Sequence, residues 1–276
     1  MQHESDTRVV LTLDAGGTKF SFSAMAAGEE IVTPIERPSH ADNLELCLKT
    51  IADGFSEIAA AVKAKIAAIS FAFPGPSYYG EGIIGDLGNL PAFRGGVPLG
   101  PMLAAKFGVP VFINNDGDLF TLGEALGGLL PAVNHELEAA GSTKRYRNLI
   151  GFTLGTGLGG GIVHNGSLFA GDNSAAGEVW LLRNAKHPHT FMEESVSIRA
   201  LQRVYRENTS TSQSENLTAK EIYEVALGKR DGNQAAAEQA FAELGAALGE
   251  CIANAVTLID GLVVLGGGLS NAYPLF

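Results

Sequence analysis

The first quarter of the chain contains two periodicities of hydrophobic residues. Residues 9–14 are a short apolar run that ends in a GGT turn, and residues 19–25 then place phenylalanines and serines at alternate positions. Such alternation predicts a strand with one buried face, so the two segments are predicted to form a β-hairpin. Over residues 44–62, apolar side chains recur every three or four positions. This spacing predicts a helix with one buried face.

Strands and helices continue to alternate through the middle of the chain. The pattern predicts a strand at 66–73, a short helix near 102–107 and a strand at 109–113. This alternation indicates an α/β fold. Residues 131–148 are polar and show no period, so we expect an exposed loop or insertion there.

The second half of the chain repeats the opening pattern. Residues 148–154 form an apolar run, a GTGLGGG turn follows, and residues 162–169 contain Asn165-Gly166, a dipeptide typical of hairpin turns. The repeated order of strand, glycine turn and strand predicts an internal duplication. Three further elements are predicted: a helix over 219–228 that starts with a capping box from Thr218 to Glu221, an Ala-rich helix over about 233–260, and a strand that starts at 262.

Composition limits the functions that the chain can have. Its 276 residues are 46% hydrophobic and 18% charged, which is enough for a substantial core. A net charge of -11 argues against binding to nucleic acid or to an anionic membrane, and it is compatible with a small neutral substrate. Cys47 and Cys251 fall among apolar helix positions, which predicts buried thiols in a reducing compartment. Without a signal sequence or an apolar run of roughly 18 residues, we expect a cytoplasmic protein.

Two glycine turns are the first candidate for chemistry. LDAGGTK and TLGTGLGGG each follow an apolar strand, where residues without a Cβ let backbone N–H groups converge on an anion such as phosphate. For either turn alone a plain tight hairpin is an equal explanation, and two such turns favour the anion site. Gly155, Gly157 and Gly160 match the dinucleotide fingerprint, but a strand rather than a helix follows, which excludes a Rossmann site. The Walker A ending is also absent from both turns.

The stretch INNDGDLFTLGEALGG, residues 113–128, is the second candidate. Asn and Asp commonly cap helices and fill turns, so a strand-to-helix junction would explain them. The alternative is a carboxylate that is placed to accept a proton from a bound substrate.

Seven motifs occur in an order that resembles a known family. They are LDAGGTK, FAFPGP, GNLPAF, VFINNDGDLFTLGEA, GFTLGTGLGGGIV, FAGDNSAAGE and VVLGGG. This set covers nearly the whole chain and is similar to that of the ROK (repressor, open reading frame, kinase) sugar kinases, members of the actin-like ATPase superfamily. The resemblance implies a duplicated α/β fold of the ribonuclease H-like type, with two lobes, here 1–117 and 118–276, and a cleft between them. It also implies that the chain ends early relative to the family, at Phe276.

The resemblance further implies an activity, which is transfer of the γ-phosphate of ATP to a hexose hydroxyl, usually at C6. Mg²⁺ would be the cofactor, a homodimer the assembly and Asp116 the catalytic base. Asp118, at the start of the following helix, is expected to be a plain helix cap. The resemblance assigns the ligands of the sugar hydroxyls to Asn89, Asn115, Glu178 and Glu193. It places Asp14, Gly16, Gly17, Thr18 and Lys19 at the first phosphate turn, with Asp14 holding Mg²⁺ through water. Gly155, Thr156 and Gly157 are at the second phosphate turn, and Gly267 and Gly268 are beside adenosine.

The residue types suit this chemistry. A sugar hydroxyl is a weak nucleophile, so a carboxylate such as Asp116 that accepts its proton is worth about 10² to 10⁴ in rate. Asn115 can donate to hydroxyls and accept from them, and glutamates accept from them. Mg²⁺ on ATP phosphates keeps several waters, so one carboxylate such as Asp14 is sufficient anchorage.

The chain departs from the family pattern in one segment. Many ROK proteins carry G-E-x-G-H and then C-x-C-G-x-x-G-C-x-E, which bind a structural zinc through the His and three Cys. Here Trp180 and Leu181 stand in place of the Gly and the His. We expect no zinc site, because His187 and His189 have no cysteine nearby. Trp180 could stack on the sugar, although packing in a core or between domains is the more common role of a single Trp.

Three functions are therefore compared. The first is a hexose kinase, with glucose favoured over fructose, mannose and N-acetylated hexosamines. The second, a transcriptional repressor of the same family, needs a helix-turn-helix domain before the first strand, where only about eight polar residues are present. The third, a catalytically inactive sugar or nucleotide sensor, is opposed by the presence of Asp14, Asn115, Asp116, Glu178 and Glu193.

Overall fold

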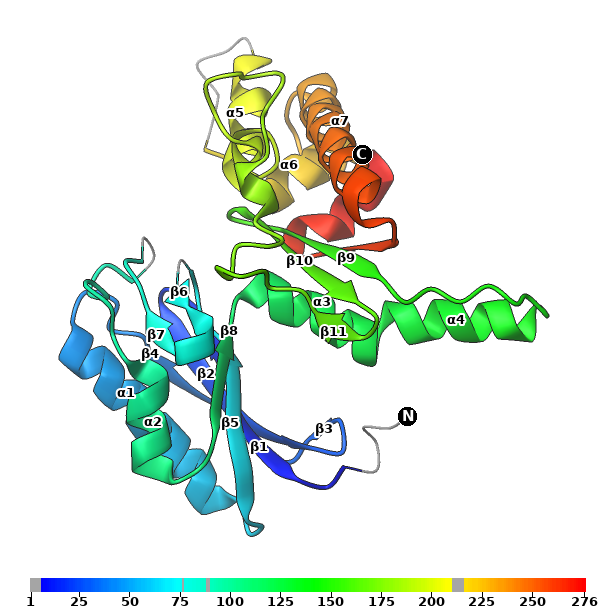
Figure 1. Ribbon diagram of the computed structural model, residues 1–276. Coiled ribbons are helices and arrows are strands. Elements are labelled where there is room, and N and C mark those ends of the chain that lie inside the picture. Colours follow the sequence, from blue (N-terminus) through cyan, green and yellow to red (C-terminus); the bar gives the residue numbers. More distant parts are fainter. Residues whose placement is uncertain (1–5, 76, 88–89, 210–215) are drawn as a thin grey trace. The chain divides into compact units, whose positions relative to one another are not determined.

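The computed structural model describes residues 6–75, 77–87, 90–209 and 216–276, and the chain separates into two compact units (Figure 1). Unit 1 consists of Met1–Leu119 with Asp172–Ser174, and unit 2 consists of Phe120–Gly171 with Ala175–Phe276. Each unit is a sheet with its own helices and its own core, so the predicted α/β class is confirmed.

The sheet of unit 1 is built on a hairpin with parallel strands beside it. Its strands are β1 (Val9–Ala15), β2 (Lys19–Ala26), β3 (Glu29–Glu30), β4 (Ile35–Pro38), β5 (Ile66–Ala72) and β8 (Val111–Asn114). β1 and β2 are antiparallel, with Leu13 opposite Phe22, which confirms the predicted hairpin. β5 is parallel to β1 and β8 is parallel to β5, while β3 and β4 both pair with β2.

The helices of unit 1 cover one face of this sheet (Figure 1). They are α1 (Leu44–Ala61) and α2 (Leu99–Phe107), and a small hairpin of β6 (Ser77–Tyr78) and β7 (Ile83–Ile84) encloses the short helix η1 (Tyr79–Glu81). Both predicted helices are present. Phenylalanines dominate the core, as in the T-shaped pair of Phe22 and Phe55, whose ring centroids are 5.3 Å apart. Cys47 is fully buried on α1, as predicted.

The sheet of unit 2 repeats this arrangement. Its strands are β9 (Leu149–Leu154), β10 (Leu158–His164), β11 (Ser167–Leu168) and β12 (Leu262–Gly266). β9 and β10 are antiparallel and β12 is parallel to β9, so the order β10-β9-β12 matches β2-β1-β5 of unit 1. Asn165 and Gly166 have φ values of 50° and 76°, as a tight turn between β10 and β11 requires. The predicted duplication is confirmed.

Three helices of unit 2 pack against one another (Figure 1). They are α5 (Ile198–Glu207), α6 (Ala219–Ala226) and α7 (Gln234–Ile259), and the short helices are η2 (Val179–Leu181), η3 (Met192–Glu194) and η4 (Gly268–Leu275). The capping box of Thr218 and Glu221 is present, as predicted. Cys251 of α7 is fully buried in the unit 2 core, which also agrees with the prediction.

The prediction of a loop at 131–148 was wrong for its first half. α3 (Asp116–Leu126) is followed by α4 (Leu129–Ala139), which buries Leu130. The polar composition hid a helical spacing, since Leu130 and the partly buried Val133 and Leu137 follow one another at intervals of three and four. The segment after the helix is held to it, because the Asn134 amide donates to the Tyr146 carbonyl and accepts from its N–H, both at 2.8 Å.

Helix α7 also differs from expectation. By length and composition alone it could cross a membrane, with a mean hydropathy of 1.3, although no run of this kind was expected. Eight of its residues form a buried stripe from Ala236 to Cys251 at helical spacing. In the structure α7 is thus a core helix of unit 2, packed on α5 and α6.

Candidate active site

The parallel strands of unit 1 bring two predicted site residues to one edge of the sheet. Leu11 pairs with Ile69, and Ile69 with Val111, so three residues further on Asp14 is level with Ala72 and Asn114. The carboxyl ends of parallel strands meet at one edge, so Asp14, at the end of β1, shares that edge with the residues that follow β8. Asp14 and Asp116 are both exposed to solvent.

The first turn of α3 fixes the residues that follow β8. Asn115 Oδ1 accepts from the Gly117 N–H at 2.7 Å, and Asp116 Oδ1 accepts from the same N–H at 2.9 Å. The N-terminus of a helix favours an anion, so this position suits a charged Asp116 carboxylate. Asp118 was predicted to cap the helix. It is the third residue of α3 and is 3% exposed, so it lies inside the first turn, and Asn115 is the residue that precedes the helix.

The loop after β5 lies against Asn115. A Cβ at Gly75 would be 3.7 Å from Asn115 Nδ2 and 2.9 Å from the Tyr79 hydroxyl, which itself donates to the Phe73 carbonyl at 2.9 Å. The small residue at 75 therefore makes room for the Tyr79 hydroxyl, and the Asn115 amide lies at ordinary contact distance from the same loop. Asn89, the other predicted sugar ligand of unit 1, lies outside the described residues.

The first glycine turn, residues 16–18, is held by a residue that the sequence did not reveal. Ser39 donates from its hydroxyl to the Gly17 carbonyl at 2.6 Å and from its N–H to the Thr18 carbonyl at 3.0 Å. In a trans peptide the C=O and the next N–H point in opposite directions, so the N–H groups of Thr18 and Lys19 point away from Ser39. The Lys19 ammonium pairs with Glu36 of β4.

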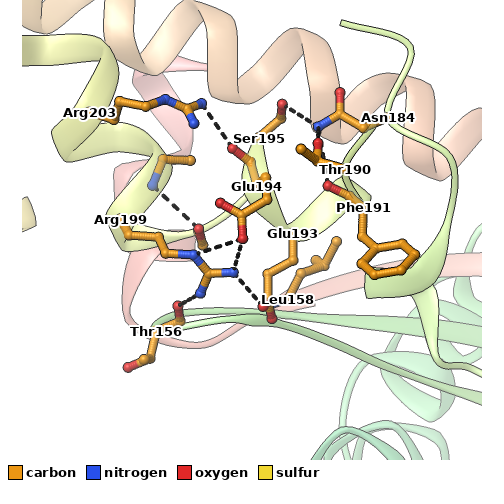
Figure 2. Close-up of polar contacts among 12 residues, drawn as sticks. Thr156, Leu158, Asn184, Thr190, Phe191, Glu193, Glu194, Ser195, Arg199 and Arg203 are labelled. Carbon is orange, nitrogen blue, oxygen red and sulfur yellow. Dashed lines mark hydrogen bonds and ion pairs between the residues drawn. The ribbon is translucent and has the colours of Figure 1, made fainter. Parts of the chain in front are cut away.

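The second glycine turn, residues 155–157, is held by groups from two later segments (Figure 2). The Gly155 carbonyl accepts from the Ile198 N–H at 2.9 Å, and Glu193 Oε2 accepts from the Leu158 N–H at 3.0 Å. A Cβ at Gly157 would lie 2.2 Å from Glu193 Oε2, so only glycine permits this approach. By the same peptide geometry, the Thr156 N–H points away from Ile198.

The third glycine stretch, residues 266–268, lies beside the second glycine turn. β12 is parallel to β9 with Gly266 opposite Thr153, so both strands end at the same edge. Gly267 has φ 81°, and a Cβ there would lie 2.4 Å from the Leu154 carbonyl oxygen, whereas a Cβ at Gly268 would meet nothing within 4 Å. The structure thus brings the residues predicted to bind phosphate and adenosine in unit 2 together.

Two acidic residues of unit 2, Glu193 and Glu194, form ion pairs with the same arginine. Arg199 Nη2 lies 2.6 Å from Glu193 Oε1 and 2.6 Å from Glu194 Oε1. The hydrogen bond from Arg199 is the main reason that the pKa of Glu194 is below its ordinary value, and the two carboxylates raise the pKa of Arg199.

The two cysteines are not candidates for catalysis. Burial raises the pKa of Cys47 to about 11 and that of Cys251 to about 12, so neither thiol is a nucleophile near neutral pH.

Glu178 and Trp180 interact directly. The indole N–H of Trp180 donates to Glu178 Oε2, and the indole ring meets the ring of Phe191 edge to face at 5.6 Å. Trp180 also packs against the unit 2 core. The ring is thus engaged in packing, and its N–H fixes the predicted sugar ligand Glu178.

A buried amide organises the segment that departs from the family pattern. Asn184 is 1% exposed, and its Nδ2 lies within 2.9–3.2 Å of the Thr190 hydroxyl, the Phe191 carbonyl and the Ser195 hydroxyl (Figure 2). Its Oδ1 accepts from the His187 N–H at 3.1 Å. Among the described residues, no group of three or more His, Cys, Asp or Glu side chains is placed to hold a metal.

A family model for the ROK family matches residues 10–276. The chain belongs to the ROK family. Among curated relatives it is 31% identical to the N-acetyl-D-glucosamine kinase of Vibrio parahaemolyticus, over 94% of this chain and 83% of that protein.

Solved structures of ROK proteins give the fold. The crystal structure of a glucokinase from Parabacteroides distasonis has a TM-score of 0.93 and 56% identity, and the match covers 100% of this chain and 77% of that one. A ROK family glucokinase from Streptomyces griseus, solved with glucose and AMPPNP, has a TM-score of 0.72 at 21% identity, over 96% of this chain and 84% of that one. The fold is therefore the two-lobed actin-like ATPase fold, as predicted.

Three residues around the ROK motifs were missed by the sequence analysis: Ser39, Asn184 and Arg199. Ser39 and Asn184 act through bonds to segments that no local pattern connects with them. Arg199 could have been suspected, because it follows two adjacent glutamates by five and six positions at the start of a helix.

Proposed function

We propose that this ROK protein is an ATP-dependent sugar kinase that phosphorylates a hexose hydroxyl, O6 of glucose or of a related hexose. The observation that carries the proposal is the 56% identity to the glucokinase of Parabacteroides distasonis over the whole chain. The similarity to N-acetyl-D-glucosamine kinases supports a hexose as the substrate class. Glucose is the preferred candidate, because the glucokinase is the more similar of these proteins.

Asp116 is the proposed general base. Its carboxylate is exposed at the start of α3, next to Asn115. As the hydroxyl oxygen forms its bond to phosphorus and the bond from phosphorus to the bridging oxygen of ADP breaks, Asp116 takes the hydroxyl proton. Asn115, Glu178 and Glu193 are the proposed ligands of the other hydroxyls, because an amide both donates and accepts while carboxylates accept.

The glycine turns are the proposed sites for the nucleotide. A Cβ at Gly155 or Gly268 would meet nothing within 4 Å, which leaves the backbone accessible to a phosphate or an adenosine. The exposed carboxylate of Asp14 at the end of β1 suits Mg²⁺, which prefers oxygen ligands and keeps most of its waters. Bound Mg²⁺ would neutralise charge on the phosphates, and the chain's own part is to position the phosphates and the hydroxyl.

A coupled assay of ADP release tests the proposal. The full chain is assayed with ATP and Mg²⁺ against glucose, fructose, mannose, N-acetylglucosamine and N-acetylmannosamine, and the phosphorylated position is read by ³¹P and ¹³C NMR. We expect the highest kcat/KM with glucose and phosphate on O6. Sugar binding measured by calorimetry without any sugar-dependent ADP release would instead identify an inactive sensor.

A further inference from the structure

Arg199 joins its neighbours Glu193 and Glu194 to the second glycine turn, which lies 43 positions earlier in the sequence. Figure 2 shows its guanidinium directed at the carboxylates of Glu193 and Glu194 and at the carbonyl of Thr156. The contacts to the carboxylates are both 2.6 Å, and the contact to the Thr156 carbonyl is a long one at 3.5 Å. One side chain therefore touches the second glycine turn and the predicted sugar ligand Glu193.

Glu193 is held from both sides. Oε1 faces Arg199, while Oε2 accepts from the Leu158 N–H at 3.0 Å, directly after the second glycine turn. Gly157 allows this contact, since a Cβ there would lie 2.2 Å from Oε2. The Glu193 side chain is only 24% exposed, so its position is set by these partners rather than by solvent. Movement of Glu193 would therefore disturb the N–H that follows the turn.

The charges around the second glycine turn favour a cation at position 199. Glu193 and Glu194 are adjacent carboxylates beside a turn for which we propose ATP phosphates as the ligand. Without a cation, two negative charges would repel both each other and the phosphates. A guanidinium suits the task because its planar fork contacts several oxygens at once and stays charged. An arginine thus holds Glu193 close to the turn and offsets part of the negative charge of the two carboxylates.

We propose that Arg199 is a positioning residue that locks Glu193 onto the second glycine turn and so couples hexose binding to nucleotide binding. This inference rests on the proposed function, in which Glu193 contacts the hexose and residues 155–157 contact the phosphates. A hexose that fixes Glu193 also fixes Leu158 and the turn, which favours the nucleotide. By linkage, the nucleotide must tighten hexose binding by the same factor.

The test replaces Arg199 by methionine, which keeps much of the aliphatic length and removes the charge. Binding of a non-hydrolysable ATP analogue is measured by calorimetry with and without saturating glucose, or with the best hexose of the substrate panel. In the wild-type chain we expect the hexose to tighten analogue binding by about 5- to 150-fold. In Arg199→Met we expect this factor to fall to about one, and KM for the hexose to rise by on the order of 10- to 100-fold.

Arg203→Met is the matched control. Arg203 lies one turn further along α5 than Arg199. It donates to the backbone carbonyl of Glu194 at 2.9 Å, so it supports η3, the short helix that contains Glu193 and Glu194, without a hydrogen bond to the Glu193 carboxylate or to Thr156. We expect it to keep the coupling factor and the KM. If both variants lose coupling to the same extent, Arg199 has only a structural role and the proposal is wrong.

Arg199→Lys keeps the proposal testable if the methionine variant unfolds. A lysine retains the charge but has no fork, so we expect coupling between the wild-type and methionine values. A folded methionine or lysine variant with wild-type coupling and KM overturns the proposal, as does a wild-type chain that phosphorylates glucose without any coupling. A wild-type chain that phosphorylates no hexose would instead defeat the proposed function, so the two failures can be told apart.

Discussion

The carboxyl-terminal edges of the two sheets are built alike but carry different side chains. In each unit a hairpin has a glycine turn and a third strand runs parallel to its first strand. The edge of unit 1 exposes the carboxylates of Asp14 and Asp116. The edge of unit 2 carries two glycine stretches, and the Glu193 carboxylate beside it is bound by Arg199 and by the Leu158 N–H.

The supports of the two glycine turns differ in the same way. Ser39 holds the first turn through neutral hydrogen bonds to two carbonyls, whereas Glu193 and Arg199 hold the second through a network of charges. The two units thus share the arrangement of their strands but differ in the contacts that support their glycine turns. For the proposed nucleotide site this difference is useful, because exposed carboxylates suit a metal ion and a proton, whereas a carboxylate paired with an arginine repels a phosphate less.

The largest expected effect is a loss of kcat when the exposed carboxylate of Asp116 in unit 1 is removed. Asp116→Asn keeps the shape of the side chain and removes the proposed proton acceptor, so kcat should fall by about 10² to 10⁴ while the hexose Kd changes little. Steady-state kinetics and calorimetry measure the two quantities. Asp53→Asn, at an exposed carboxylate paired with Lys49 on α1, is the control and should leave kcat unchanged. Full activity of the Asp116 variant would assign the base elsewhere.

The next effect tests the close approach of strands in unit 2. Gly267→Ala combines a φ of 81° with a Cβ 2.4 Å from the Leu154 carbonyl oxygen, so we expect a loss of about 2–4 kcal/mol in the free energy of unfolding. The neighbouring variant Gly268→Ala meets no atom within 4 Å and should change stability by less than about 0.5 kcal/mol. Urea unfolding of both variants provides the measurement. Equal stabilities would contradict the close contact of β12 with the end of β9.

A smaller effect is expected at the first glycine turn. Ser39 is 2% exposed, so Ser39→Ala removes a buried hydrogen bond to the Gly17 carbonyl and should cost about 1–2 kcal/mol. Ser56→Ala removes a bond to a carbonyl within α1 and should cost less, because the carbonyl keeps its helical partner. The same unfolding assay compares them. If Ser39→Ala were neutral, the first turn would be held by its own hairpin.

The sequence predicted the strands and hairpins of the two sheets better than helix α4 or the contacts that hold the glycine turns. Strand periodicity and glycine turns are local signals, so both hairpins were found, and Thr218 with Glu221 marked a helix start within four residues. α4 was missed because its apolar positions lie among many polar ones, and its core contact through Leu130 begins before the segment that reads as polar.

The supporting contacts could not be predicted in this way, because they join residues that are distant in the sequence. Ser39 contacts Gly17 across 22 positions, and Glu193 contacts Leu158 across 35. Nothing in the local composition pairs them; only the fold does. The glycines in the turns were recognisable from the sequence, but the position of Glu193 Oε2, 2.2 Å from where a Cβ of residue 157 would lie, was not.

The smallest expected effect is the pH dependence of the ionic support in unit 2. The hydrogen bond from Arg199 lowers the pKa of Glu194, so its stabilisation is present above the ordinary pKa of the carboxyl, 4.5, and is lost as the pH falls through the lowered value. Since the Glu194 side chain is 37% exposed, water screens the pair and we expect no more than about 1 kcal/mol. Urea unfolding of the wild type and Arg199→Met at pH 7, 5, 4 and 3 should therefore give a stability difference that narrows at the acidic end. A difference that is constant across this range would mean that Arg199 contributes to stability by packing, and that the charges of the second turn act on ligands alone.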